Sequence, residues 1–127
     1  MSRPRRLLIV EDDPSLRSLY EEEFREEGYE VECSPSGEEA VRIAREKPFD
    51  AAVLDIRLGG MDGIAAMQRL LVQRPGLAVV LNTAYTSFKS DFATWAADRY
   101  VVKSSDLGEL KSAVRESILQ RRGAKTA

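Results

Sequence analysis

Short apolar runs alternate along this chain with longer segments whose apolar residues recur at helical spacing. Five runs of strand length occur, over residues 7–10, 29–33, 51–54, 77–81 and 100–102. A strand followed by a helix re-enters a sheet in the same direction, so this alternation predicts a parallel sheet with helices on both faces. Right-handed crossovers then leave only a few topologies.

Residue types at the segment ends indicate where the helices begin and end. The first helix is expected to start at Pro14 and to end at Gly28. The second opens at Ser36 with Glu39 three residues later, which is the spacing of a capping box. A weaker fourth helix is expected within 88–96. We therefore predict an α/β fold, a flavodoxin-like (βα)5 doubly wound parallel sheet with strand order 2-1-3-4-5.

The chain length suits one domain. Its 127 residues predict a single domain over 1–122 and a flexible tail over 123–127. A net charge of −2 gives no reason to expect direct binding to nucleic acid. The apolar run at 7–10 is too short for a signal-peptide core or a membrane span, so no membrane partner is expected.

Cysteine and histidine content limits the chemistry further. One cysteine, Cys33, cannot form an internal disulfide, which fits a reducing, cytoplasmic location. The chain has no histidine, which excludes Ser-His and Cys-His catalytic pairs and imidazole metal ligands. Any metal site would have to be built from oxygens, and oxygen ligands favour a hard cation such as Mg²⁺.

Polar residues follow the predicted strands, at the edge where such a sheet binds ligands. They are Glu11, Asp12 and Asp13 after the first run, Asp55 after the third, Asn82 and Thr83 after the fourth, and Lys103 after the fifth. A cluster of carboxylates repels itself, and Mg²⁺ bound by Asp12, Asp55, water and backbone carbonyls would remove that repulsion. The pattern predicts an oxygen-built Mg²⁺ site at this edge.

The same residues suit a carboxylate that receives a phosphoryl group. Asp55 would attack in line, Mg²⁺ and Lys103 would stabilise the charge on the equatorial oxygens, and Thr83 would hydrogen-bond the incoming anion. Each residue alone has a simpler interpretation: Asp12 as a helix cap, Thr83 as a loop hydroxyl and Lys103 as a solvated surface lysine. The prediction depends on their joint occurrence at successive strand ends.

Four segments resemble the motifs of response regulator receiver domains, which are the phosphoacceptors of two-component signalling and share the fold of the chemotaxis regulators. The segments are LLIVEDDPSLR (first strand and acid pair), VLDIRLGGMDG (phosphorylation site and loop), VVLNTAY (fourth strand and switch hydroxyl) and DRYVVKS (fifth strand and lysine). They occur in the family's order over roughly 5–120. The resemblance implies a signalling domain that catalyses its own phosphorylation and dephosphorylation, not a metabolic enzyme.

The resemblance also implies the metal ligands. Asp55 matches the phosphoryl acceptor, and Glu11 and Asp12 match the acid pair that holds Mg²⁺. Asp12 would bind the metal directly, and Glu11 could act through water. The backbone carbonyl of Arg57 matches a further protein ligand, beside Asp55 itself.

The remaining motif positions match a switch. Thr83, Lys103 and the amide of Ala84 would contact the phosphoryl oxygens, and Tyr100 would turn inward when Thr83 moves. From the residues alone, Tyr100 could equally be a packed strand residue with an exposed hydroxyl. The implied donor is a sensor histidine kinase or phosphotransfer protein. The implied output face, made by the fourth helix, fifth strand and fifth helix, would bind an output domain, a target protein or a second copy.

The sequence departs from the family pattern at several positions. Ser104 follows Lys103 where the family usually has a cis proline, so the peptide bond between them is either trans or strained. The segment 86–100 predicts a short or irregular fourth helix. Arg57 and Tyr85 flank the phosphoryl site, and their bulk predicts restricted access of water and a longer-lived phosphoryl group.

Three other hypotheses fit parts of the pattern. A pseudo-receiver would bind proteins without phosphorylation, but the chain retains the four residues a phosphoacceptor needs. A phosphatase with an aspartyl nucleophile usually needs an acid two residues later, where this chain has Arg57. A flavin site needs a phosphate-cradling loop after the first strand, and the acids of EDDPS would repel phosphate.

Overall fold

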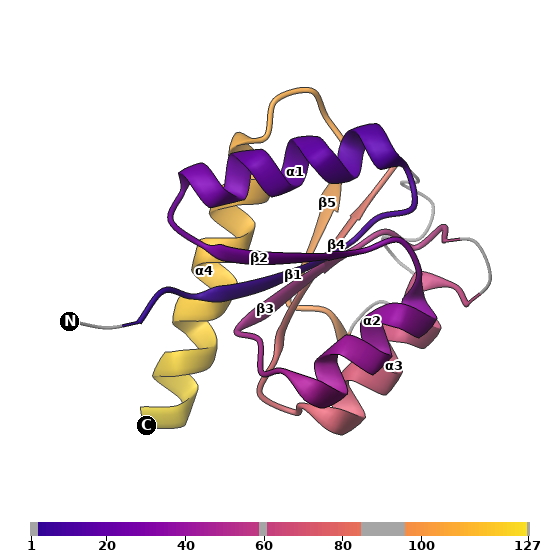
Figure 1. Cartoon of the computed structure of the whole chain (residues 1–127). Helices are drawn as coiled ribbons and strands as arrows, with labels where there is room; N and C mark the ends of the chain where they lie inside the picture. The colour runs from indigo at the N-terminus through magenta and orange to yellow at the C-terminus, as the bar shows by residue number, and fades with distance from the viewer. Residues whose placement is uncertain (1–2, 59–60, 85–95, 127) are drawn as a thin grey trace.

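Five parallel strands form one sheet, and helices pack against both of its faces (Figure 1). The computed structural model describes residues 3–58, 61–84 and 96–126. The strands are β1 (Arg6–Val10), β2 (Glu30–Ser34), β3 (Ala51–Leu54), β4 (Ala78–Thr83) and β5 (Arg99–Val102). The helices in the described part of the chain are α1 (Pro14–Glu26), α2 (Gly37–Glu46), α3 (Gly63–Gln73) and α4 (Gly108–Thr126).

The strand order is β2-β1-β3-β4-β5, which confirms the predicted doubly wound topology. β3 covers the predicted residues 51–54, whereas β4 extends beyond the predicted 77–81 to Thr83. The extension exists because Asn82 and Thr83 pair with the last two residues of β5. The two polar residues that were expected to follow the fourth strand are therefore its last residues.

Strand side chains alternate between two apolar layers, as the two-residue period of a strand requires. The α2/α3 layer takes Leu8, Val10, Ala52, Leu54, Val79 and Leu81 from the strands, with Ala40, Val41, Met67 and Leu70 among its helix residues. The α1/α4 layer takes Leu7, Ile9, Ala51, Val53, Ala78, Val80 and Val101 from the strands, with Tyr20, Phe24, Leu110 and Val114 among its helix residues. The face on which a residue lies therefore follows from its position along the strand.

Side-chain caps start three of the helices. Asp13 accepts hydrogen bonds from two amides at the start of α1, and Asp62 accepts one at the start of α3. Ser36 accepts from the amide of Glu39 at the predicted start of α2. Gly28, with φ of 97°, follows α1 and turns the chain toward β2 in a conformation that glycine adopts without strain.

α4 continues to Thr126 and so includes residues 123–126, for which the sequence predicted a flexible tail. The flexibility of this segment stays a prediction. The weaker helix expected within 88–96, together with Tyr85, falls almost entirely on residues 85–95, which lie outside the described residues. None of the helices in the described ranges is long and apolar enough to cross a membrane.

Candidate functional site

Charged side chains meet where β1, β3 and β5 end, on the face that carries α1 and α4. The Lys103 Nζ lies 2.6 Å from the Asp55 Oδ2 and 2.8 Å from the Glu11 Oε1. Asp55 is 6% exposed and Glu11 is 2% exposed. Glu11, Asp55 and Lys103 each lie two positions after a strand residue of the α1/α4 layer. Side chains two positions apart along a strand point to the same face, so these three side chains point toward the α1/α4 layer. One ammonium group therefore bridges two buried carboxylates.

Burial and pairing shift the pKa values of these groups. Burial raises the pKa of the Glu11 carboxyl, and hydrogen bonds from Lys103 and the Asp13 amide offset only part of that increase. Burial by itself lowers the pKa of Lys103, but its hydrogen bonds with Asp55 and Glu11 outweigh burial and raise the net pKa. Lys103 is therefore charged at neutral pH. A fixed ammonium group of this kind can stabilise negative charge that develops beside Asp55.

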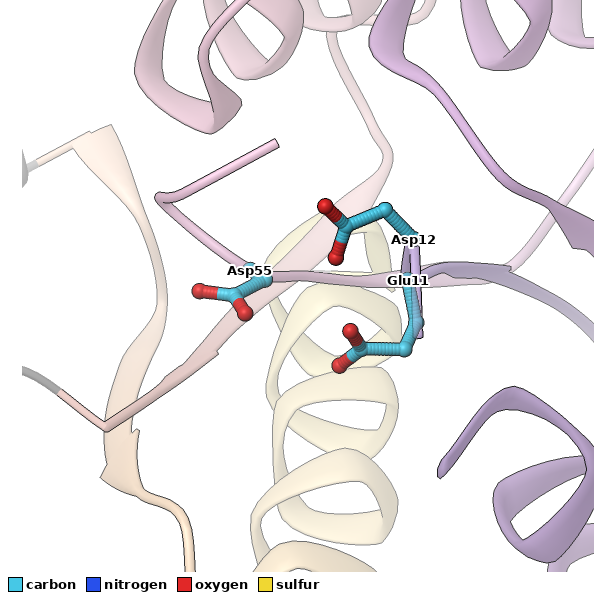
Figure 2. A group of neighbouring side chains, drawn as sticks. All are labelled: Glu11, Asp12 and Asp55. Carbon is cyan, nitrogen blue, oxygen red and sulfur yellow. The ribbon is translucent and has the colours of Figure 1, made fainter. Parts of the chain in front are cut away.

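Asp12 completes an acidic cluster with Glu11 and Asp55, and Figure 2 shows its carboxylate turned toward the Asp55 side of the group. One carboxylate oxygen from each of the three residues lies within 4.8 Å of the others. Asp12 is exposed, so the cluster is accessible from solvent on that side. Three carboxylates face one ammonium, and the donors are all oxygens, which is the donor set of a hard divalent cation. The residues present therefore fit Mg²⁺.

The turn between β1 and α1 gives its acids different roles. Arg17 Nη1 donates to the carbonyl oxygens of Glu11 at 2.9 Å and Asp12 at 3.4 Å, which holds the turn. The Asp13 amide donates to the Glu11 carboxylate at 3.2 Å, while the Asp13 side chain caps α1. The Asp13 side chain is therefore engaged in capping α1, and the Asp12 carboxylate belongs to the acidic cluster.

The loop after β3 holds Asp55 from its other side. The Arg57 amide donates to the Asp55 Oδ1 at 3.1 Å, and the Gly63 amide donates to the Ile56 carbonyl oxygen at 2.8 Å. A Cβ on Gly63 would overlap the backbone carbonyl oxygen of Asp55, so only glycine allows this approach. The first residue of α3 therefore packs directly against the main chain of the central carboxylate.

Thr83 and Tyr100 lie on the opposite face of the sheet from Lys103. Thr83 is fully buried at the end of β4, and Tyr100 is partly buried against the α2/α3 layer. The Thr83 carbonyl oxygen accepts a hydrogen bond of 2.8 Å from the Lys103 amide. Ala84 is exposed immediately after the strand. The peptide bond between Lys103 and Ser104 is trans, which decides between the two alternatives that the sequence allowed.

Sequence reasoning missed Arg17, Gly63 and Tyr20 as contributors to the site, and it placed Asn82 at the edge of the sheet without assigning it a role. The Asn82 Nδ2 donates a hydrogen bond of 3.1 Å to the Tyr20 hydroxyl, and both residues are buried. A signal for Asn82 was available, because an amide there interrupts an apolar row at alternate positions of the strand. The approach of Gly63 to Asp55 gives no such signal in the sequence.

Comparison with protein families matches residues 7–115 to the response regulator receiver domain. Among curated relatives, the transcriptional regulatory protein TcrA of Mycobacterium tuberculosis is 36% identical over 120 residues, which cover 93% of this chain and 47% of that protein. The chain spans between about a quarter and about a half of the length of the curated relatives that it matches.

Solved structures include similar chains. The response regulator protein TrrA of Thermotoga maritima, in complex with Mg²⁺-BeF, is 38% identical with a TM-score of 0.86, and the match covers 89% of this chain and 98% of that one. TrrA in complex with the histidine kinase ThkA also matches, at 38% identity and a TM-score of 0.83, over 89% of this chain and 97% of that one. These matches agree with the topology of the sheet.

Proposed function

The chain belongs to the family of response regulator receiver domains, and on this basis we propose that it accepts a phosphoryl group on Asp55 from a sensor histidine kinase or phosphotransfer protein. The observation that carries the proposal is the position of the Asp55 carboxylate, buried against Lys103 and beside Glu11 and Asp12. The complex of TrrA with a histidine kinase supports a kinase as the donor. A cytoplasmic location follows from such a donor and belongs to the same proposal.

The chemistry is a group transfer to a carboxylate. An oxygen of Asp55 attacks the phosphorus of the donor in line, the donor's bond to phosphorus breaks, and the leaving group takes the electron pair. Lys103 offsets the charge on the equatorial oxygens. When held by Glu11, Asp12, Asp55 and the Arg57 carbonyl, Mg²⁺ supplies further positive charge at these oxygens. The complex of TrrA with Mg²⁺-BeF supports such a site.

The same site would hydrolyse its acyl phosphate, with water as the nucleophile at phosphorus. The product is inorganic phosphate, and Asp55 is restored as a free carboxylate. The domain is in this sense a signalling device that turns over its own modification. The exposed Arg57 beside the site and Tyr85 are proposed to slow this reaction by restricting access of water.

Phosphorylation would switch the domain through Thr83 and Tyr100. The phosphoryl group adds about −1.5 to −2 charges beside Lys103, and the Thr83 hydroxyl and Ala84 amide would turn toward its oxygens. Space vacated by Thr83 would allow Tyr100 to turn inward. The common face of the two residues supports this coupling. The output face would include β5, α4 and the segment before β5, and would bind an output domain, a target protein or a second copy.

Intact mass spectrometry after incubation with acetyl phosphate and Mg²⁺ tests the proposal. Wild type should gain one phosphoryl group, and the gain should require Mg²⁺ and disappear in Asp55→Asn. Asp13→Asn is the matched control, because asparagine keeps the helix cap and the side chain lies outside the acidic cluster. If wild type gains nothing from acetyl phosphate or from any histidine kinase, the chain is a phosphorylation-independent interaction module instead.

A further inference from the structure

Asn82 is the last residue of β4 on the face of the sheet that carries the α1/α4 layer, and it is polar. Ala78, Val80 and Asn82 lie at alternate positions of β4, so their side chains share this face. Leu54 of β3 pairs with Leu81 of β4, and continuing that register by one residue places Asp55 beside Asn82. Asn82 therefore lies next to the phosphoryl acceptor on the adjacent strand, one residue before Thr83.

Asn82 is tied to α1 by a buried hydrogen bond. Its Nδ2 donates to the Tyr20 hydroxyl at 3.1 Å, and the two residues are 3% and 2% exposed. Burial raises the pKa of the Tyr20 phenol, and the charges of Lys103, Glu11 and Asp55 also act on it, so the hydroxyl lies within electrostatic reach of the site. The phenol is protonated at neutral pH and remains a hydrogen-bonding group.

A buried hydrogen-bonded pair of this kind restricts the relative position of two elements more than it raises the free energy of unfolding. Replacing both partners by apolar groups of the same shape is often nearly neutral for stability, whereas a hydrogen bond restricts distance and direction. Here the restricted parts are the middle of α1 and the end of β4. The Thr83 carbonyl oxygen in turn accepts from the Lys103 amide, so the constraint extends to the end of β5.

We propose that Tyr20 and Asn82 are positioning residues for phosphoryl transfer, because their hydrogen bond fixes the end of β4 against α1 and so holds Thr83 and Lys103 beside Asp55. The inference rests on the proposed function of Asp55 and adds to it a requirement located on α1. Loss of the bond leaves the charged groups of the site intact and changes only how accurately they are placed.

The double variant Tyr20→Phe/Asn82→Leu separates positioning from stability. Both partners become apolar groups of similar shape, so the urea midpoint should remain near that of wild type. The maximal rate of phosphorylation by acetyl phosphate should fall about tenfold or more, because small displacements of reacting groups are costly. The Mg²⁺ concentration for half-maximal rate should stay within about twofold, since the metal-binding carboxylates are unaltered.

Tyr29→Phe is the matched control for the loss of a phenol. Tyr29 packs against the same α1/α4 layer at the other end of the sheet, with its ring 5.6 Å from that of Phe24. This variant should be phosphorylated at the wild-type rate. A comparable loss of rate in Tyr29→Phe would show that the effect comes from the layer in general and would overturn the inference.

Amide hydrogen exchange gives a second readout that needs no phosphorylation. In the double variant the Lys103 amide, bonded to the Thr83 carbonyl oxygen, should exchange faster than in wild type. The Asp98 amide, which bonds to the Val79 carbonyl oxygen at the far end of the same strand pair, should be unchanged. This pattern would show that the hydrogen bonds between β4 and β5 are weakened only at the end of the strand pair beside Asp55.

The two proposals fail in different ways. If wild type and the double variant are phosphorylated at equal rates, the positioning role is overturned while the function of Asp55 stands. If wild type is not phosphorylated at all, the proposed function fails. Hydrogen exchange at the Lys103 amide then decides by itself whether the bond between Tyr20 and Asn82 fixes the ends of β4 and β5. An unchanged amide would then overturn the inference.

Discussion

Lys103 is the residue on which the electrostatics of the site depend. Its ammonium lies within 2.8 Å of a Glu11 oxygen and 2.6 Å of an Asp55 oxygen, and its side chain is 17% exposed. A cation between two buried acids stabilises them chiefly by preventing an uncompensated charge. The residue therefore links the stability of the site to its chemistry.

We expect Lys103→Met to lower the free energy of unfolding by about 1–3 kcal/mol at pH 7, because two buried carboxylates lose their cation. Added Mg²⁺ should recover part of the loss. Urea unfolding with and without Mg²⁺ measures both effects. Lys111→Met is the control, since that lysine pairs with Glu23 away from the site. A loss in Lys103→Met that Mg²⁺ does not reduce would argue against a shared cation site.

Cys33 on β2 is the residue with a pH-dependent prediction. Burial raises the pKa of its thiol from about 9 to about 11. The folded chain should therefore react slowly with iodoacetamide at pH 8, and its rate should keep rising toward pH 11. Because the folded pKa exceeds the unfolded one, the stabilising effect of the neutral thiol is complete below pH 9 and is lost as pH rises through 11.

Alkylation followed by mass spectrometry, with the urea-denatured chain as reference, measures the pH profile of the Cys33 thiol. The denatured profile should have its midpoint near the ordinary value for a thiol. Coincident profiles for the folded and denatured chains would contradict the assigned burial.

At the scale of elements, the position of α3 depends on its first residue. Gly63→Ala would place a methyl group against the Asp55 carbonyl oxygen, so α3 or the strand end has to move. We expect a loss of about 1–3 kcal/mol in the free energy of unfolding and slower phosphorylation of Asp55. Urea unfolding and intact mass measure the two effects.

Gly108→Ala is the control for Gly63→Ala, because Gly108 is also the first residue of a helix. There the added Cβ would lie 3.1 Å from the Asp106 side-chain oxygen that accepts a hydrogen bond from the Gly108 amide, so only a small shift of that side chain is needed. This variant should be nearly as stable as wild type. Equal losses in the two variants would show that the cost comes from helix starts in general, not from the approach to Asp55.

At the scale of the whole molecule, the sheet separates the charges of the site from its proposed switch. The side chains of Glu11, Asp55 and Lys103 point toward α1 and α4, whereas Thr83 and Tyr100 belong to the α2/α3 face. Figure 1 shows these helix pairs on opposite sides of the strands. A structural change at the carboxyl ends of the strands can therefore affect side chains in both the α1/α4 and the α2/α3 layer.

Binding of Mg²⁺ should stabilise the entire fold, because the acidic cluster joins residues that directly follow β1 and β3, which lie side by side only in the folded sheet. Stabilisation should grow by about 1.4 kcal/mol for each tenfold increase in Mg²⁺ above its dissociation constant. Thermal unfolding over a Mg²⁺ series measures this. Asp12→Asn should remove most of the dependence and Asp13→Asn should keep it. An unchanged response in Asp12→Asn would remove that residue from the metal site.

The sheet, its strand order and the meeting of Glu11, Asp12, Asp55 and Lys103 at one edge could be predicted from the sequence. These follow from local properties: the period of apolar residues sets each element, and parallel strands end at a common edge. The two-residue period of the strands also predicts the face of the sheet on which each side chain lies. The extension of β4 to Thr83, however, depended on pairing with β5.

The contacts between distant elements could not be predicted from the sequence, because they depend on how the helices pack on the sheet. Tyr20 and Asn82 are 62 residues apart, and their bond requires α1 to pack at one height on the sheet. Two other contacts also depend on how whole elements pack against each other. They are the approach of Gly63 to Asp55 and the bridge from Lys103 to both acids. Periodicity assigns a side chain to a face, whereas its partner on the covering helix is selected by packing across the entire layer.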